Sequence, residues 1–233
     1  DDIAWTLNMR GTDVHCNPVF VSYLVIEHEK TTLFVDNDKL TSEVSAYLSM
    51  LSIKVLPYNE VGKYLKRAYN ILLDPNETNS YLVACAKEGR AAVVLTTSPI
   101  PEMKAVKNET EIQGFHNAMK RDGVAMVKFL KWLIPAVKAG HETEISLDKK
   151  LTYLRSQQPL FRDSSFDTIV GYEHHGAIVH YEATPETDIA IEPHGFVLID
   201  SGAQYQDGTT DITRTIALGP ITELQKRIYT LVL

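Results

Sequence analysis

The amino-acid sequence predicts two consecutive segments of different class, an α/β domain followed by an α+β domain. Over residues 1–98, short runs of β-forming residues alternate with helix-like patterns, which is typical of a mixed sheet with helices between its strands. From about residue 108, two helical patterns precede a series of β-like runs. Between the segments lies Ser98-Pro99-Ile100-Pro101, whose prolines lack a backbone N–H and disfavour helix. We therefore predict domains at residues 1–100 and 101–233.

The first segment is expected to open with a β-hairpin formed by residues 19–26 and 31–35. A helix over residues 39–51 follows, because its apolar residues recur at helical spacing on one face. The remainder is expected to alternate strands at 53–56, 71–73 and 91–95 with helices near 60–68 and 79–87.

The second segment is expected to begin with a long helix. Asn108 and Glu111 have the spacing of a capping box, Pro135 is expected to kink the last turn, and Gly140 stands where the helix ends. The stripe predicted to face the core comprises Ile112, Phe115, Met119, Met126, Leu130, Leu133 and Val137. A second helix from Thr143 precedes β-like runs at 167–171, 177–181, 195–200 and 211–217 and a last helix near residue 222.

Composition excludes several classes of function. The net charge is −7 and the pI about 5.6, so the chain as a whole lacks the excess positive charge that is typical of nucleic-acid-binding proteins. No apolar run approaches the length of a bilayer span, and the first residues do not resemble a secretory leader. Cys16 and Cys85 lie in unrelated contexts without zinc-ribbon spacing, which favours free thiols in a reducing compartment.

Two aspartates stand out as candidate metal ligands. Asp200 ends the β-like run 196–199, Asp211 begins the run 212–216, and turn-forming residues separate the two runs. Antiparallel strands joined in this way bring both carboxylates to one place, where hard oxygen ligands suit one or two divalent cations. The alternative is that each aspartate only caps a turn. An unpaired carboxylate in a sheet is costly, which favours the metal interpretation.

A cluster of histidines provides a further candidate. His174-His175-Gly176 resembles an exposed turn, whereas His180 ends the apolar run 177–179 and is expected at a strand end facing the same cleft as Asp200. A neutral imidazole there can ligate metal, donate to an oxyanion or carry a proton. A purely structural histidine is an equally good explanation of the spacing.

Longer blocks of sequence resemble a known family. His180-Tyr181, LIDSGAQY at 198–205, DGTTDITRT at 207–215 and the helix at 107–133 are similar to the catalytic core of Xaa-Pro aminopeptidases, which belong to the pita-bread metallopeptidase superfamily. Residues 3–26 resemble the second domain of the long, three-domain, cytosolic type. The resemblance implies a partial creatinase-N-like mixed α/β domain followed by the first half of a pita-bread catalytic domain.

The resemblance also implies a chemistry. Family members hold two divalent ions, usually Mn²⁺, which activate water for attack on the bond between an N-terminal residue and a following proline. On this alignment Asp200 chelates one ion, Asp211 bridges both, and His180 contacts substrate without ligating metal. The family type further implies a cytoplasmic protein and a homodimer.

The match is incomplete, because the family's ligating histidine and two glutamates come well after the aspartate pair. The chain begins without Met and ends in a helical pattern without a stop signal, so we expect a fragment with two of five ligands, weak metal binding and no peptidase activity. Three alternatives stay open: a prolidase-like Xaa-Pro dipeptidase, a metal-free pita-bread binding module and an isolated interaction fragment.

The stretch holding Asp13, His15, Asn17 and Pro18 has two interpretations. The resemblance implies that this region helps to frame the active site of the long enzymes. The alternative is that Asn17-Pro18 forms a turn before the first strand.

Overall fold

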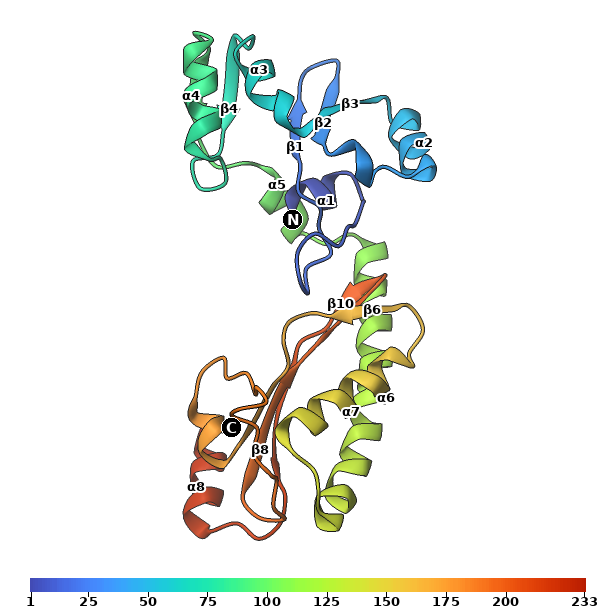
Figure 1. The fold of residues 1–233 in the computed structure, drawn as a ribbon, viewed down its shortest axis with the longest axis vertical. Helices are drawn as coiled ribbons and strands as arrows, with labels where there is room; N and C mark the ends of the chain where they lie inside the picture. The colour runs from blue at the N-terminus through green and yellow to red at the C-terminus, as the bar shows by residue number, and fades with distance from the viewer. The chain divides into compact units, whose positions relative to one another are not determined.

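The computed structural model describes residues 1–233, which form two compact units. The first unit comprises Asp1–Val14 and Pro18–Val106, and the second comprises His15–Asn17 and Lys107–Leu233. Figure 1 shows the helices and strands of each unit. No helix combines the length and the apolar character that are needed to cross a membrane.

The first unit is built on a mixed three-stranded sheet with strand order β1-β2-β3. β1 (Tyr23–Ile26) is antiparallel to β2 (Thr31–Val35), and β3 (Ile53–Pro57) is parallel to β2. A second sheet pairs β4 (Asn70–Leu73) with β5 (Ala92–Leu95) in parallel. The helical segments are α1 (Asp2–Thr6), η1 (Asn37–Lys39), α2 (Ser42–Met50), η2 (Tyr58–Glu60), α3 (Val61–Leu65), α4 (Ser80–Glu88) and α5 (Ile100–Ala105).

Strand β2 lies at the centre of this unit because it is covered on both faces. Phe34 packs into a cluster with α3 and α4, whereas Leu33 and Val35 pack into a cluster with α2. All three side chains are at most 1% exposed. The continuous apolar run Leu33-Phe34-Val35 is the pattern expected of a strand buried on both faces.

The second unit begins with two long helices and continues with two antiparallel sheets. The helical segments are α6 (Glu109–Ala139), α7 (Glu144–Ser156), η3 (Glu173–Ala177) and α8 (Glu223–Val232). One sheet has the order β11-β8-β7, formed by Ile212–Ala217, Phe196–Ser201 and Ile169–Tyr172. The other has the order β10-β9-β6, formed by Gly208–Thr209, Ala203–Tyr205 and Phe161–Ser164.

The main core of this unit lies between the two long helices and one face of the β11-β8-β7 sheet. Val197 and Ile199 on β8 are buried there with Phe129 and Leu133 of α6 and Leu147 of α7. Figure 1 shows α6 and α7 on the same side of β8. Because side chains alternate along a strand, Leu198 and Asp200 face the opposite side, which is only half-buried.

Helix α6 begins and ends where the sequence predicts, although its buried face differs. Asn108 and Glu111 form the predicted capping box, with reciprocal hydrogen bonds of 2.9 Å, and Gly140 ends the helix at a φ of +84°. Ile112, Phe115 and Met119 are exposed, contrary to the predicted stripe. Gly114 and Ala118 are buried instead, because the β9–β10 hairpin packs too closely there for larger side chains.

Two further features of the second unit differ from the expectation. Residues 177–181 do not form a strand, because η3 and a turn occupy this stretch. The strands β6, β9 and β10 are additional, and they are only two to four residues long. Such short strands leave too few positions for alternation to be recognised.

Candidate active site

Asp200 lies on the central strand of the β11-β8-β7 sheet. It pairs with Thr213 of β11 on one side and with Ile169 of β7 on the other. Its Oδ1 atom is buried and has no hydrogen-bond partner. A buried carboxylate oxygen without a partner is costly, and a cation is one of the few groups that can offset the cost.

Asp211 immediately precedes β11 and is exposed. It lies two residues before Thr213, the cross-strand partner of Asp200. Because residues two apart share a face of an extended chain, Asp211 is a diagonal neighbour of Asp200 on the half-buried face. The prediction that adjacent antiparallel strands carry the two aspartates is confirmed, with the β9–β10 hairpin inserted between them.

His180 does not end a strand, in contrast to the expectation. It lies in the turn that follows η3, in the left-handed region with a φ of +55°, and its side chain is exposed and makes no hydrogen bond. The reason is that η3 packs over β7 and so displaces a strand: a Cβ atom on Gly171 would lie 2.8 Å from Gly176. Gly176 also approaches Leu198, which shares its face of β8 with Asp200. The η3 segment, which ends three residues before His180, therefore packs near Leu198 over the face of the sheet on which Asp200 lies.

A buried glutamate that the sequence analysis did not identify holds this segment in place. Glu144, at the first turn of α7, is 0% exposed. Its carboxylate accepts hydrogen bonds from the Tyr172 backbone N–H at 2.8 Å and the Tyr181 hydroxyl at 2.9 Å. His175 Nδ1 lies 3.0 Å from the same carboxylate, so this histidine is not the exposed turn residue that we expected. Glu144 thus fixes the residue next to His180, and burial raises the pKa of the Tyr181 hydroxyl.

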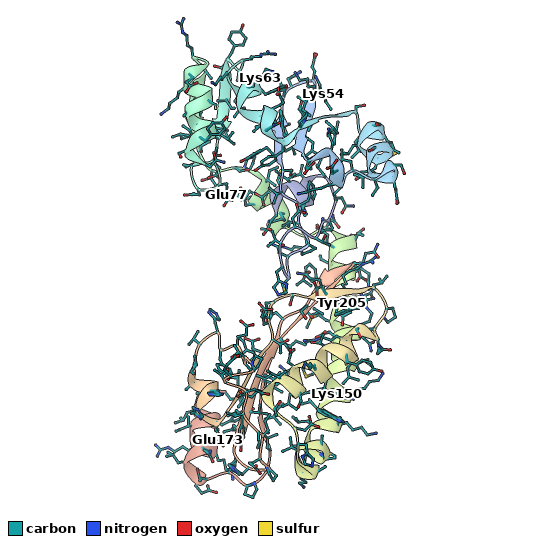
Figure 2. The ribbon with its side chains drawn as sticks, viewed as in Figure 1. Lys54, Lys63, Glu77, Lys150, Glu173 and Tyr205 are labelled. Atoms are coloured by element: carbon teal, nitrogen blue, oxygen red, sulfur yellow. The ribbon has the colours of Figure 1, made fainter.

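A second buried network fixes the end of β8. Arg155 of α7 makes a bidentate pair with Asp122 of α6, with N–O distances of 2.8 and 3.0 Å. The Tyr205 hydroxyl donates to Asp122 at 3.1 Å, and Arg155 also reaches the carbonyl of Ser201, the residue after Asp200. Burial, reinforced by the Asp122 carboxylate, raises the pKa of Tyr205, which is labelled in Figure 2. The only sequence signal for this network is a charged residue on the apolar side of a helix.

The residues present suit a divalent cation. Asp200 offers a partly buried oxygen without a partner, and Asp211 offers a second carboxylate on the same face. Both are hard oxygen donors, which Mg²⁺, Ca²⁺ and Mn²⁺ prefer. The fold positions them on a rigid strand pair whose other face is a packed core.

Comparison with known families identifies the class to which this fold and site correspond. Residues 113–233 match the model of metallopeptidase family M24, and residues 1–111 match that of the creatinase/prolidase N-terminal domain. The chain therefore belongs to metallopeptidase family M24. Its architecture is a creatinase N-terminal-like domain followed by half of a pita-bread catalytic domain, which confirms the predicted fold class.

Individual relatives bear the names of proline-specific peptidases. The whole chain is 44% identical to Xaa-Pro aminopeptidase 1 of Dictyostelium discoideum and 40% identical to Xaa-Pro aminopeptidase ApepP of Drosophila melanogaster. The crystal structure of X-prolyl aminopeptidase from Caenorhabditis elegans, described as a cytosolic enzyme with a di-nuclear active site, superposes on 96% of the chain with a TM-score of 0.89 and 34% identity. An Xaa-Pro dipeptidase from Bacillus anthracis shares the fold, with a TM-score of 0.77 at 20% identity over 99% of the chain and 62% of its own.

The chain spans only part of these relatives. It covers 38% of the length of the Dictyostelium protein, 39% of the Drosophila protein and 38% of the Caenorhabditis enzyme.

Proposed function

We propose that this chain carries the aspartate half of the active site of an Xaa-Pro aminopeptidase. The proposal rests on one observation above all: a buried carboxylate oxygen of Asp200 without a partner lies on the same sheet face as Asp211. The 44% identity to an Xaa-Pro aminopeptidase supports this assignment over other members of the superfamily. The substrate is then a peptide with proline in the second position.

Each of the three predicted residues receives a role in this proposal. Asp200, on a central strand with its backbone paired on both sides, is a rigid ligand, and Asp211 reaches the same place from the next strand. His180, which has no intramolecular partner, is free to contact the substrate. Two bound divalent ions, Mn²⁺ in this proposal, supply an activated water and polarise the scissile carbonyl.

We further propose that the 233 residues alone are inactive. The resemblance implies three more ligands, one histidine and two glutamates, and the chain covers 38% of its Dictyostelium relative. With two carboxylates and no further protein ligand, the ions keep most of their water, so the affinity is low.

Calorimetric titration with Mn²⁺ and hydrolysis of an Xaa-Pro-Xaa tripeptide test this proposal. The chain is expected to bind Mn²⁺ no more tightly than millimolar and to release no amino acid, and Asp200→Asn is expected to abolish the remaining heat. The full-length Dictyostelium relative serves as the positive control. Micromolar affinity with turnover from the 233-residue chain would refute its inactivity. If Asp200→Asn binds Mn²⁺ with the same heat and the same affinity as the unmodified chain, the metal site itself is refuted.

Two alternative functions can be distinguished from this proposal, one by the substrate that is cleaved and the other by whether function depends on the metal ligands. A prolidase-like enzyme cleaves Xaa-Pro dipeptides but not tripeptides, and a binding module tolerates loss of both aspartates. Equivalent substitutions in the full-length relative distinguish the three outcomes. Retention of both carboxylates on one face favours the peptidase.

The remaining assignments follow from the family type. A cytosolic location is supported by the description of the Caenorhabditis enzyme, and the net charge of −7 supports the absence of a nucleic-acid partner. A homodimer in the longer enzyme is a proposal from the resemblance alone.

A further inference from the structure

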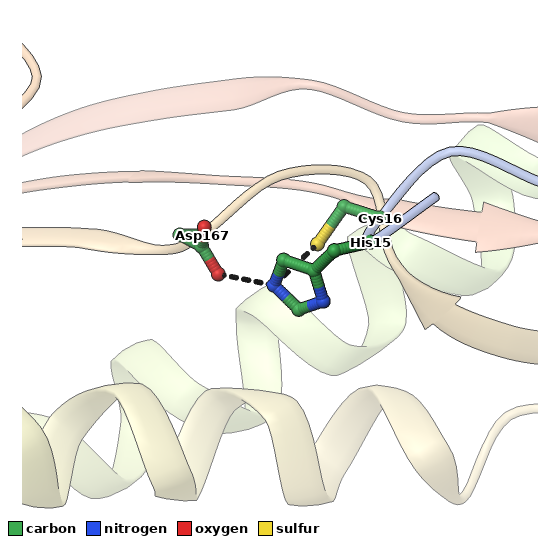
Figure 3. A group of neighbouring side chains, drawn as sticks. All are labelled: His15, Cys16 and Asp167. Atoms are coloured by element: carbon green, nitrogen blue, oxygen red, sulfur yellow. Dashed lines mark hydrogen bonds and ion pairs between the residues drawn. The ribbon is translucent and has the colours of Figure 1, made fainter. Parts of the chain in front are cut away.

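Three potential metal ligands, none of them assigned a role above, converge in the second unit. His15 Nε2 lies 2.7 Å from Asp167 Oδ1 and 3.4 Å from Cys16 Sγ, and the three ligand atoms lie within 4.8 Å of one another (Figure 3). His15 and Asp167 are exposed and Cys16 is half-buried, so solvent can reach the group. An imidazole, a thiol and a carboxylate within this distance combine the three donor types that zinc accepts.

The local backbone explains how adjacent side chains come together. Neighbouring residues of an extended chain point to opposite sides, yet Cys16 has a φ of +56°, which turns its side chain towards that of His15. Gln204 of β9 donates from Nε2 to the Cys16 carbonyl at 3.1 Å and so ties residues 15–17 to the second unit. Asp167 lies two residues before β7 begins at Ile169. The group is thus held by contacts outside itself.

The surroundings favour a cation. Two further carboxylates, those of Asp163 and Glu182, lie near enough to the His15 imidazole to act on it by their charge. Asp167 also lines a hollow of about 90 Å³, whose other lining residues include the acidic residues Glu144, Asp148 and Glu182. A negative field of this kind attracts a divalent ion and opposes an anion.

We propose that His15, Cys16 and Asp167 form a zinc-binding site with an open fourth position. Tetrahedral zinc at its usual bond lengths separates a nitrogen ligand from a sulfur ligand by about 3.5 Å and from an oxygen ligand by about 3.4 Å. The first separation is 3.4 Å here, whereas the 2.7 Å contact between His15 and Asp167 has to open. The thiol and the carboxylate already lie within 4.8 Å of each other. Insertion of the ion breaks that hydrogen bond, requires the His15 tautomer with its proton on Nδ1, and releases the thiol proton of Cys16 to solvent. Water fills the fourth position, because the side chains are accessible.

Cobalt substitution under reducing conditions tests the proposal on the 233-residue chain. The titration is carried out on the unmodified chain and on the double variant Asp200→Asn/Asp211→Asn. In the double variant, the carboxylate pair of the proposed peptidase centre cannot contribute to metal binding. One equivalent of Co²⁺ is expected to produce a thiolate charge-transfer band in the near ultraviolet, which Zn²⁺ removes. Cys16→Ser should abolish the band and weaken Zn²⁺ binding by more than about tenfold, and His15→Ala and Asp167→Asn should also weaken it by about tenfold or more.

Two matched controls separate this site from nonspecific binding. Cys85→Ser removes the other thiol, which is buried in the first unit, and Asp163→Asn removes a nearby carboxylate that is not a proposed ligand. Both should keep the band, and far-ultraviolet circular dichroism verifies that each variant is folded. Absence of a thiolate band, its persistence in Cys16→Ser, or unchanged zinc affinity in all three ligand variants would overturn the proposal.

Discussion

At the scale of single residues, the Asp122–Arg155 pair is a buried ion pair whose disruption should destabilise the second unit. Both side chains are almost fully buried, with exposures of 0% and 2%, and the pair joins α6, α7 and β8. Loss of one partner leaves an uncompensated charge in the core, whereas loss of both leaves only a packing defect. The pair therefore connects elements that are far apart in the sequence.

Asp122→Ala is expected to lower the free energy of unfolding of the second unit by about 3–5 kcal/mol. Arg155 loses both carboxylate contacts, and the Tyr205 hydroxyl loses its acceptor. The double variant Asp122→Leu/Arg155→Met is expected to be considerably more stable than Asp122→Ala. Urea denaturation followed by circular dichroism measures both changes. A loss below 1 kcal/mol for Asp122→Ala would mean that Arg155 can reach water and is not held in the core.

Asp74 links the stability of the first unit to pH. The backbone N–H of Ser98 donates to Asp74 Oδ2 at 2.6 Å, and that of Asn76 donates to Oδ1 at 2.9 Å. These hydrogen bonds, that from Ser98 most of all, lower the pKa of the carboxyl below its ordinary value of 3.8. A carboxyl with a lowered pKa in the folded state contributes stability that is complete above the unfolded value and is lost as pH falls through the folded value.

Asp74→Asn is therefore expected to lower the melting temperature at pH 7, because the amide nitrogen cannot accept the second hydrogen bond. The difference from the unmodified chain should remain constant down to about pH 5 and shrink below pH 3.8. Glu29→Gln, at an exposed residue without hydrogen bonds, is the control and should change little at any pH. Equal shifts at pH 7 and pH 3 would show that the charge of Asp74 is unimportant.

Residues differ in how far their environment can be predicted from sequence. Asp200 and Asp211 could be singled out because each adjoins a run of β-forming residues, a local signal. Glu144 could not, since its partners Tyr172 and Tyr181 are 28 and 37 residues away and nothing near it in the sequence indicates burial. The same holds for His15 and Asp167, which are 152 residues apart.

At the scale of elements, the first half of α6 packs through small residues on its buried side. A Cβ atom on Gly114 would lie 2.1 Å from the carbonyl oxygen of Asp207, in the turn of the β9–β10 hairpin. Arg121, one turn beyond Ala118, also pairs with the Asp207 carboxylate. The hairpin that separates Asp200 from Asp211 therefore packs directly against the α6 backbone, and this close approach requires glycine at position 114.

Gly114→Ala is expected to destabilise the second unit by about 1–3 kcal/mol, because either the helix or the hairpin must move. Gly123 is the matched control in the same helix, since a Cβ atom added there meets nothing within 4 Å. Gly123→Ala should stabilise the unit by about 0.5–1 kcal/mol through higher helix propensity. Thermal denaturation of both variants measures the two changes in stability, which should have opposite signs. Equal effects would show that helix propensity, and not contact with the hairpin, decides the outcome at Gly114.

Elements were predictable where their signals are local. The capping box of α6 and its terminal glycine depend on residues a few positions apart, and both are present in the structure. The strand predicted at 177–181 is wrong because its apolar run is overridden by the packing of η3 against Gly171, a tertiary contact. The buried side of the early α6 turns was likewise decided by the hairpin.

At the scale of the whole molecule, the second unit supports its two aspartates with contacts made within that unit. The β7-β8-β11 sheet, its helical layer and the buried networks around Glu144 and Asp122 are formed by residues 107–233 alone. The proposed centre is expected to lack ligands in this chain, because the family resemblance implies a histidine and two glutamates in addition to the two aspartates. Fold stability and metal affinity should therefore be separable in this chain.

Manganese is accordingly expected to have little effect on the stability of the 233-residue chain. A ligand that binds only the folded state stabilises it by RT ln(1 + [L]/Kd), which is about 0.4 kcal/mol at 1 mM for a millimolar site and about 4 kcal/mol for a micromolar one. The chain should thus melt only about 1–2 °C higher in 1 mM Mn²⁺, and Asp200→Asn should remove that shift. The full-length Dictyostelium relative, with a complete set of ligands in this proposal, should gain about tenfold more free energy under the same conditions. Differential scanning fluorimetry measures both proteins. A gain of about 4 kcal/mol in the short chain, abolished by Asp200→Asn, would mean that groups within these residues complete a tight centre.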